Sequence, residues 1–214
     1  MKNRKIYRGV EITLAVIICA LVVICGFVLS KYVHQKVLSG SVSISASLGD
    51  VAVKEHEAVP DGHGSYTLGA TEVTENTYGV VLPGLDIPKD PFVKVENKSK
   101  IPAYVYVEVV DGKLKEAKIT YTIADSWKLL EGVTGKNGGL VYVYVSGDAP
   151  VKVASDISSI QILENNTLYV SDALDRTQVD LSLKFYASLG ECSATVLADG
   201  ISAAADVYKK LINP

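Results

Sequence analysis

The hydrophobic pattern of this chain changes abruptly near residue 40. Residues 12–29 read ITLAVIICALVVICGFVL, eighteen residues without a charge. As a helix this run would be about 27 Å long, close to the hydrocarbon thickness of a bilayer. Further on, Val42, Ile44 and Leu48 belong to a row of apolar residues that alternate with serines, the period of a half-buried β-strand. The chain therefore joins a segment suited to lipid to a region suited to stacked sheets.

A basic segment precedes the apolar run. Residues 1–11 hold four basic residues and one acid. Positive residues beside a membrane segment stay on the cytoplasmic side, so the rest of the chain is expected outside the membrane. We therefore predict a cytoplasmic segment at 1–11, a signal peptide or transmembrane anchor at 12–29, a stalk at 30–40 and an extracellular domain at 41–214.

The pattern leaves the fate of the leader open. The run is long for a signal peptide and no A-x-A cleavage site follows it, so a cleaved signal and a retained anchor are both consistent with it. A buried core helix is a weaker alternative, because basic residues flank the run. A type IV pilin leader is another, but Glu11 follows Gly9 by two residues where pilins have five, and Ser39-Gly40 ends the apolar helix early.

The domain after the stalk is acidic and holds one cysteine. Residues 41–214 keep 15 of the 21 basic residues and 23 of the 24 acidic ones, a net charge of −8. This charge repels phosphate backbones, so no nucleic-acid partner is expected. Cys192 is the only cysteine in the domain, so no disulfide can form within it. We expect Cys192 to be a small buried apolar residue.

Short segments of alternating apolar residues follow one another through the domain. The strongest is Ala103–Val110, which places Tyr104, Tyr106 and Glu108 on one face and valines on the other. Turn residues such as 60–64 separate these segments. The other strands are expected at 42–53, 92–96, 119–123, 140–145, 159–163 and 179–186.

One segment near the end of the chain has helical spacing. It is Asp199–Ile212, with Asp199 as a plausible cap, and its apolar face would hold Ile201, Ala204, Ala205, Tyr208 and either Leu211 or Ile212. We expect this helix to close one end of a sandwich. The fold class is therefore predicted as all-β: an antiparallel β-sandwich with an N-terminal hydrophobic helix and a short C-terminal helix.

Histidines, the commonest catalytic metal ligands, are few. The domain holds only His56 and His63, and no H-E-x-x-H is present. Glu55-His56-Glu57 with His63 would form a weak metal site if the turn at Pro60 brought both imidazoles together. We expect these residues instead to be solvated members of a hairpin.

Other catalytic and binding motifs are also lacking. There is no G-x-S-x-G, and no glycine-rich phosphate loop that opens a helix. Asp86, Asp90 and Asp148 fall in expected loops without the D-x-D-x-D-G spacing of a calcium site. We predict no catalytic, cofactor-binding or metal-binding residues, and no cofactor.

Three stretches of the domain, in this order, resemble the TasA/camelysin family of exported Gram-positive proteins. The first is the leader running into SVSISASLGDVAV. The second is VVLPGLDIPKDPFVKVENKSKIPAYVYVEVV, a proline-glycine turn followed by two strands around an Asn-containing turn. The third is Asp125-Ser126-Trp127, then Leu140–Val145, the strand LSLKFYAS and an Ala-rich helix. The resemblance covers most of residues 41–212.

The resemblance implies a jelly-roll-like sandwich, export through a SipW-type signal peptidase and a role at the cell surface or in an extracellular, biofilm-type matrix. Fibre-forming members pass an N-terminal strand to a neighbour, a form of β-strand addition. Here Ser41–Val53 would be that strand. The alternatives are a monomeric, membrane-anchored binding module and a secreted camelysin-like metal-dependent endopeptidase. Residues 12–29 would contact the membrane, and a homo-oligomer or fibre is the expected assembly.

Overall fold

The computed structural model describes residues 49–79, 81–175, 181–192 and 200–213. Contacts group Leu48–Pro214 into one compact unit, and the predicted leader and stalk lie outside the described residues. The unit consists of antiparallel β-strands and one C-terminal α-helix, which confirms the all-β prediction. Within the described ranges, no helix has the length and apolar character needed to span a bilayer.

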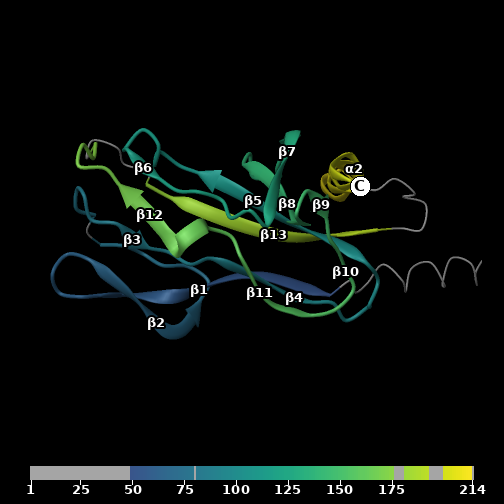
Figure 1. Cartoon of the computed structure of the whole chain (residues 1–214), viewed down its shortest axis with the longest axis horizontal. Helices are drawn as coiled ribbons and strands as arrows, with labels where there is room; N and C mark the ends of the chain where they lie inside the picture. Colours follow the sequence, from purple (N-terminus) through teal and green to yellow (C-terminus); the bar gives the residue numbers. More distant parts are fainter. Residues whose placement is uncertain (1–48, 80, 176–180, 193–199, 214) are drawn as a thin grey trace, which may run out of the picture. The chain divides into compact units, whose positions relative to one another are not determined.

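The first sheet contains four strands in the order β11-β4-β1-β2 (Figure 1). They are β11 (Ile157–Gln161), β4 (Phe92–Glu96), β1 (Asp50–Pro60) and β2 (Tyr66–Val73). Strand β1 changes partner along its length. Its residues Asp50–Lys54 pair with β4, whereas Glu55 and the residues after it pair with β2. The second half of β1 and β2 thus form a two-stranded hairpin at the edge of the sheet.

The second sheet contains six strands arranged around β5. This central strand pairs with β13 along nine residues, and with β8 and β10 on its other side. Strand β8 also pairs with β7 and β9. The six strands are β5 (Ala103–Asp111), β7 (Trp127–Thr134), β8 (Leu140–Ser146), β9 (Ala149–Pro150), β10 (Lys152–Val153) and β13 (Leu183–Glu191).

A third, small sheet lies at one end of the unit, on the left in Figure 1. It consists of β3 (Ile87–Pro88), β12 (Thr167–Val170) and β6 (Ile119–Thr120). The 3-10 turn η1 (Glu164–Asn166) directly precedes β12. Asn165 and Asn166 have φ of 56° and 55°. Asparagine tolerates this left-handed conformation better than most residues, which suits it to the turn.

The two larger sheets pack face to face over one apolar core. Along β5, Val105, Val107 and Val109 point into this core, together with Val93 and Val95 of β4. These five side chains are almost fully buried. The alternation predicted for β5 is therefore confirmed, and it directs the valines between the sheets.

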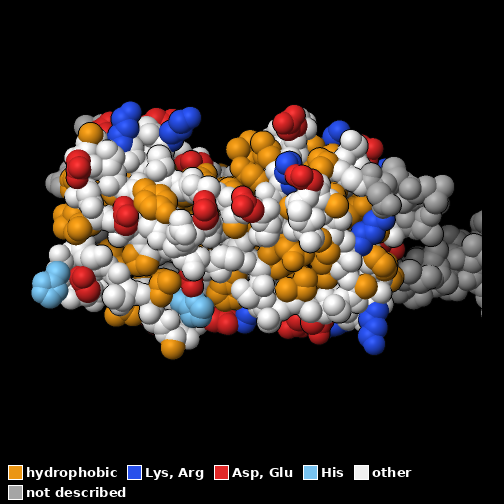
Figure 2. Space-filling model, viewed as in Figure 1, with side chains coloured by type: hydrophobic (Ala, Val, Ile, Leu, Met, Phe, Trp, Pro, Cys, Tyr) orange, Lys and Arg blue, Asp and Glu red, His pale blue; other side chains and the backbone are white. Residues whose placement is uncertain are grey.

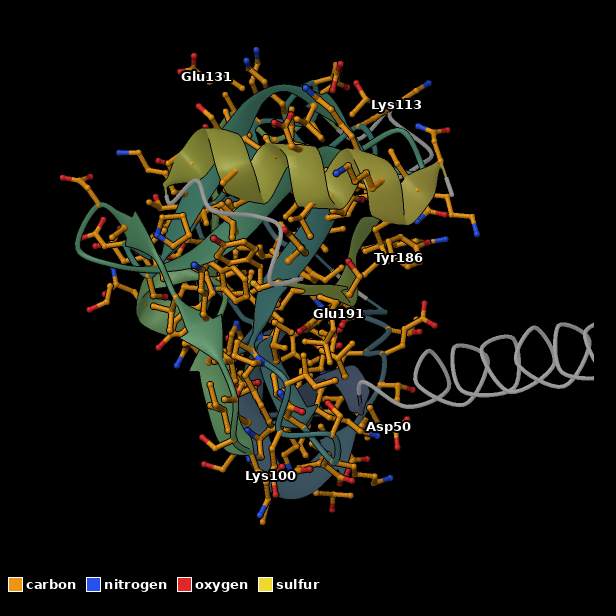
Figure 3. All side chains as sticks on the ribbon, turned by 90° about the vertical axis from the view of Figure 1, so that its right-hand side faces the viewer. Asp50, Lys100, Lys113, Glu131, Tyr186 and Glu191 are labelled. Carbon is orange, nitrogen blue, oxygen red and sulfur yellow. The ribbon has the colours of Figure 1, made fainter. Side chains whose placement is uncertain are left out.

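The outer face of the six-stranded sheet is covered by α2 (Ile201–Ile212). Tyr104 and Tyr106 of β5 form a second apolar cluster with the helix residues Ala204, Val207 and Tyr208. The prediction that this helix closes one end of the sandwich is wrong, because α2 lies across the sheet (Figure 3). The tyrosines and valines on that face are too apolar to remain in water, and the helix buries them.

The predicted helix boundaries and face need smaller corrections. The predicted cap, Asp199, lies outside the described residues, and Gly200 stands at the N-cap without a side-chain hydrogen bond. Ala203 and Val207 are buried in addition to the expected Ala204 and Tyr208, whereas Ile201 and Ala205 are only partly buried.

Three predicted strands coincide with observed ones, and the segment predicted at 179–186 overlaps β13 only from Leu183 onward. The segments predicted at 92–96, 103–110 and 140–145 match β4, β5 and β8 to within one residue. The segment at 119–123 is shorter than predicted, and 159–163 is shifted two residues toward the C-terminus relative to β11. Strands β2, β3, β7, β9, β10 and β12 were not predicted. Strands β2 and β7 mix polar and apolar residues, because much of each is exposed, and the other four strands are only two to four residues long.

Candidate functional site

Strand β13 forms one edge of the six-stranded sheet. All nine of its residues pair with β5, and among the described residues no strand pairs with its other edge. Leu183, Phe185 and Ala187 point toward the core between the sheets, whereas Lys184 and Tyr186 are exposed. The edge therefore offers unpaired backbone groups beside a row of apolar side chains.

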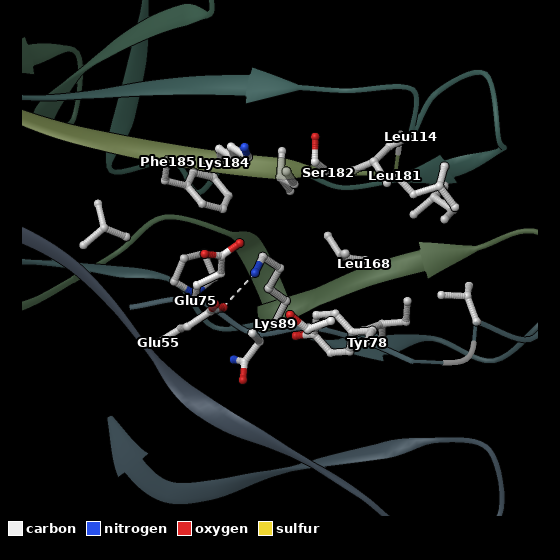
Figure 4. A pocket seen from close by; sticks show the side chains of 18 of the residues that line it. Glu55, Glu75, Tyr78, Lys89, Leu114, Leu168, Leu181, Ser182, Lys184 and Phe185 are labelled. Carbon is white, nitrogen blue, oxygen red and sulfur yellow. Dashed lines mark hydrogen bonds and ion pairs between the residues drawn. The ribbon is translucent and has the colours of Figure 1, made fainter. Parts of the chain in front are cut away.

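A cavity of about 700 Å³ lies along this edge (Figure 4). Leu181, Ser182 and Phe185 lie on one side of it, and Glu55, Tyr78 and Lys89 lie on the other. We call this cavity the β13 groove. Its volume is in the range of ligand-binding sites and far above the voids usual in protein interiors. The remaining apolar lining comes from Val53, Val81, Ile87, Pro91, Leu114, Ile119, Leu168, Leu174 and Leu183.

A buried ion pair stands in the wall of the β13 groove. Lys89 Nζ donates to Glu55 Oε2 at 2.7 Å, and both residues are less than a tenth exposed. The ammonium also lies 5.7 Å from the centre of the Tyr78 ring. Burial raises the pKa of the Tyr78 hydroxyl, which donates to the carbonyl of Pro88 at 2.8 Å. Glu55 is thus part of the protein interior, which corrects the expectation that it is solvated.

Side chains bind the backbone groups of β1 just beyond Lys54, where its pairing with β4 stops. Asp90 accepts the backbone N–H of His56 at 2.9 Å and contacts His56 Nδ1 through its second oxygen at 2.5 Å. Asn76 accepts the N–H of Ala58 at 2.8 Å and donates to the carbonyl of His56 at 2.7 Å. The side chains of Asp90 and Asn76 therefore make hydrogen bonds to the β1 backbone that a neighbouring strand makes elsewhere in the sheet.

The weak metal site that the sequence left as an alternative is not assembled, because its two histidines have separate partners. His63 lies in the turn after β1 and its backbone N–H donates to Asp61, whereas His56 is held by Asp90 (Figure 2 shows the two imidazoles apart). Within the described ranges, no group of three or more His, Cys, Asp or Glu side chains is placed to hold a metal ion. Within these ranges, the His56 ring is hydrogen-bonded to Asp90 through Nδ1, and its backbone is bonded to Asp90 and Asn76.

The other residues considered from sequence have separate roles. Cys192 is partly buried and packs against the cluster beneath α2. Asp86 accepts the backbone N–H of Val170 at 3.2 Å, and Asp148 contacts Lys128 at the surface. The structure does not bring these residues together at one place.

A second buried carboxylate organises the turn between β7 and β8. Glu108 accepts the backbone N–H groups of Asn137 and Gly139 at 2.7 and 2.9 Å, and the Asn137 amide at 3.0 Å. An added Cβ at Gly135 would lie 2.1 Å from the Glu108 carboxyl carbon. The glycines expected in a hairpin loop are indeed in a turn, and Gly135 leaves room for this carboxylate.

Sequence reasoning missed the residues that build the β13 groove. Glu55-His56 on β1 meets Lys89-Asp90, two adjacent residues more than thirty positions later, so that each acid faces a base. Two neighbouring pairs of opposite charge were the only signal in the sequence, and nothing local indicates that they meet. A search of known protein families, of curated proteins and of solved structures finds no match to this chain.

Proposed function

We propose that this chain is an exported structural protein of the cell surface or extracellular matrix, and that copies assemble when the segment before β1 of one copy enters the β13 groove of the next. The observation that carries the proposal is the edge of β13 that no other described strand pairs with, beside an apolar cavity of about 700 Å³. A strand at the edge of a sheet, next to a cavity that can take apolar side chains, is the usual acceptor for an added strand.

The segment before β1 has the residues that such a site requires. In 41–48, Val42, Ile44, Ala46 and Leu48 alternate with serines. A strand presents alternate side chains to opposite faces, so the apolar row would fill the groove while the serines face water. Backbone groups of the added strand would pair with the unpaired edge of β13. Filling the cavity would remove the energetic cost of apolar surface that packs against nothing.

The donated segment is shorter than the sequence suggested. Asp50–Val53 belong to β1 and pair with Val93–Glu96 of the same chain. They are therefore committed to their own sheet, which corrects the expectation that all of Ser41–Val53 is donated. Only the residues before Asp50 remain for a neighbour, and they lie almost entirely outside the described residues.

The remaining parts of the proposal rest on the leader and on the resemblance. The uncharged run at 12–29 behind a basic start supports export, with membrane contact before any cleavage. The resemblance to the TasA/camelysin family supports a jelly-roll arrangement of the two sheets, a helical leader and removal of that leader by a SipW-type peptidase. In this proposal the protein is not an enzyme, and the His56–Asp90 pair is structural.

Assembly can be tested on the protein recovered from cells, by electron microscopy and light scattering. We expect Ile44→Asp to abolish assembly, because it puts a charge on the row that enters the groove. Ser43→Asp is the matched control, since the same charge then faces water, and it should still assemble. A wild-type protein that stays monomeric at all concentrations, or an Ile44→Asp variant that assembles normally, would contradict the proposal.

N-terminal sequencing of the same material decides what becomes of the leader. A start between residues 30 and 41 indicates cleavage and leaves the segment before β1 available to a neighbour. An intact Met1 in all of the protein would favour the anchored binding module, with the groove as its ligand site.

A further inference from the structure

One wall of the β13 groove is a segment with few attachments to the rest of the fold. Thr74–Gly79, which follows β2, supplies six consecutive lining residues. Within the described ranges, this segment makes no backbone–backbone hydrogen bond to the sheets. We call it the strap. Segments with exposed side chains and few backbone hydrogen bonds are the ones that open most readily in a folded protein.

Two side chains hold the strap in place. Asn76 binds the edge of β1 through both amide atoms, at Ala58 N–H and at the carbonyl of His56. Tyr78 donates to the carbonyl of Pro88, and its ring meets the Tyr66 ring edge-on at 5.0 Å between centres. These contacts join the strap to β1, to β2 and to Pro88 of β3, all on the side of the groove opposite β13 (Figure 4).

We propose that the strap is a gate over the β13 groove and that Asn76 is its latch. The inference rests on the proposed function, since it concerns how the acceptor site opens to an incoming strand. A strand that pairs with β13 must pass between β13 and the strap. Release of the Asn76 amide frees the strap from β1 while the two sheets keep their own pairing.

The latch also protects the edge of β1. When Asn76 leaves, the N–H of Ala58 and the carbonyl of His56 lose their partners. Unpaired backbone groups cost free energy unless water or another strand satisfies them. The closed strap is therefore favoured in the isolated protein, and a donor that enters the groove has to displace it.

The test follows the uptake of a fluorescent peptide of residues 41–48 by the full chain in detergent. The chain carries Ile44→Asp so that it cannot donate its own segment. We expect Asn76→Ala to speed both uptake and release on the order of tenfold, the factor expected for the loss of two neutral hydrogen bonds. Tyr78→Phe should give a smaller acceleration, because it keeps the ring contact. Ser158→Ala, an exposed position on β11 outside the groove lining, should change nothing.

The outcomes separate the gate from the proposed function. If the peptide binds but Asn76→Ala and Tyr78→Phe leave both rates unchanged, the gate is wrong and the acceptor site stands. If the peptide binds to none of the variants, including the one with only Ile44→Asp, both inferences are wrong. The near-ultraviolet circular dichroism of Trp127 reports whether each variant is folded, and Tyr78→Phe supplies a second test if Asn76→Ala fails to fold.

Discussion

The two sides of strand β13 are built in opposite ways. On the outer side, α2 covers the sheet so closely that a Cβ added at Gly190 would lie 2.7 Å from Val207 and 2.8 Å from the Tyr106 ring. On the inner side, next to Phe185, the β13 groove leaves a cavity of about 700 Å³. The difference shows that the chain can pack a sheet tightly where it supplies its own cover. In the proposed function, the groove is the place that the segment of a neighbouring copy fills.

The largest expected effect concerns the ion pair in the groove wall. Glu55→Leu should lower the free energy of unfolding by about 3 kcal/mol, because it leaves the Lys89 ammonium buried without its carboxylate. The double variant Glu55→Leu/Lys89→Met should lie within about 1 kcal/mol of the wild type, since two apolar side chains replace the pair. Urea unfolding followed by Trp127 fluorescence measures both. A single variant no less stable than the double one would mean that water fills the groove and hydrates Lys89.

A pair of glycines compares the filled side with the open side directly. Gly190→Ala should cost about 2 kcal/mol, because neither α2 nor the Tyr106 ring has room for the new methyl group. Gly79→Ala, in the strap, should change stability by less than about 0.5 kcal/mol, since the nearest atom is 3.9 Å from the added Cβ. Thermal and urea unfolding of the two variants check this. Equal costs would contradict the contrast between the two sides.

High pH should destabilise the protein through tyrosines on both sides. Burial raises the pKa of Tyr106 beneath α2 and of Tyr78 in the groove wall. Above pH 10 the unfolded chain releases these protons while the folded protein keeps them, so stability falls as the pH rises. Each tyrosine contributes about 1.4 kcal/mol per pH unit, and Tyr106→Phe or Tyr78→Phe should reduce the slope by that amount.

Urea unfolding at a series of pH values between 9 and 12 measures this slope. If Tyr78→Phe leaves the slope unchanged while Tyr106→Phe reduces it, the hydroxyl on the groove side is solvated and the wall is more open than the structure shows. Ser158→Ala, which alters an exposed side chain without a titratable group, is the control that should leave the slope unchanged.

The smallest effect comes from adding one methylene group to the cluster beneath α2 and one to the lining of the β13 groove. Val143→Ile, in the cluster beneath α2, should destabilise by about 1 kcal/mol, because the side chain is fully enclosed. Val53→Ile lines the groove and should be neutral or stabilise by up to about 0.8 kcal/mol, as the methylene enters empty apolar space. Opposite signs in urea unfolding would support the comparison, and a loss of stability in both would weaken it.

Local sequence patterns predicted much of the fold. The alternation in Ala103–Val110 and Leu140–Val145 predicted two central strands, because neighbouring side chains on a strand point to opposite faces. Strand β2 was missed because it is largely exposed, so its apolar residues follow no period. The position of α2 was predicted wrongly, because a helical period shows which residues share one face of the helix. It does not show which part of the sheets that face packs against.

The sequence by itself determined the class of the domain, the identity of its central strands and the apolar row before β1, since all three depend on residues close together in the chain. Only the tertiary structure decided the β13 groove. Glu55 meets Lys89, and Asn76 meets the β1 edge, across loops whose closure depends on how the two sheets pack. Contacts between residues so far apart depend on the position of whole strands, and no periodicity within either segment records that position.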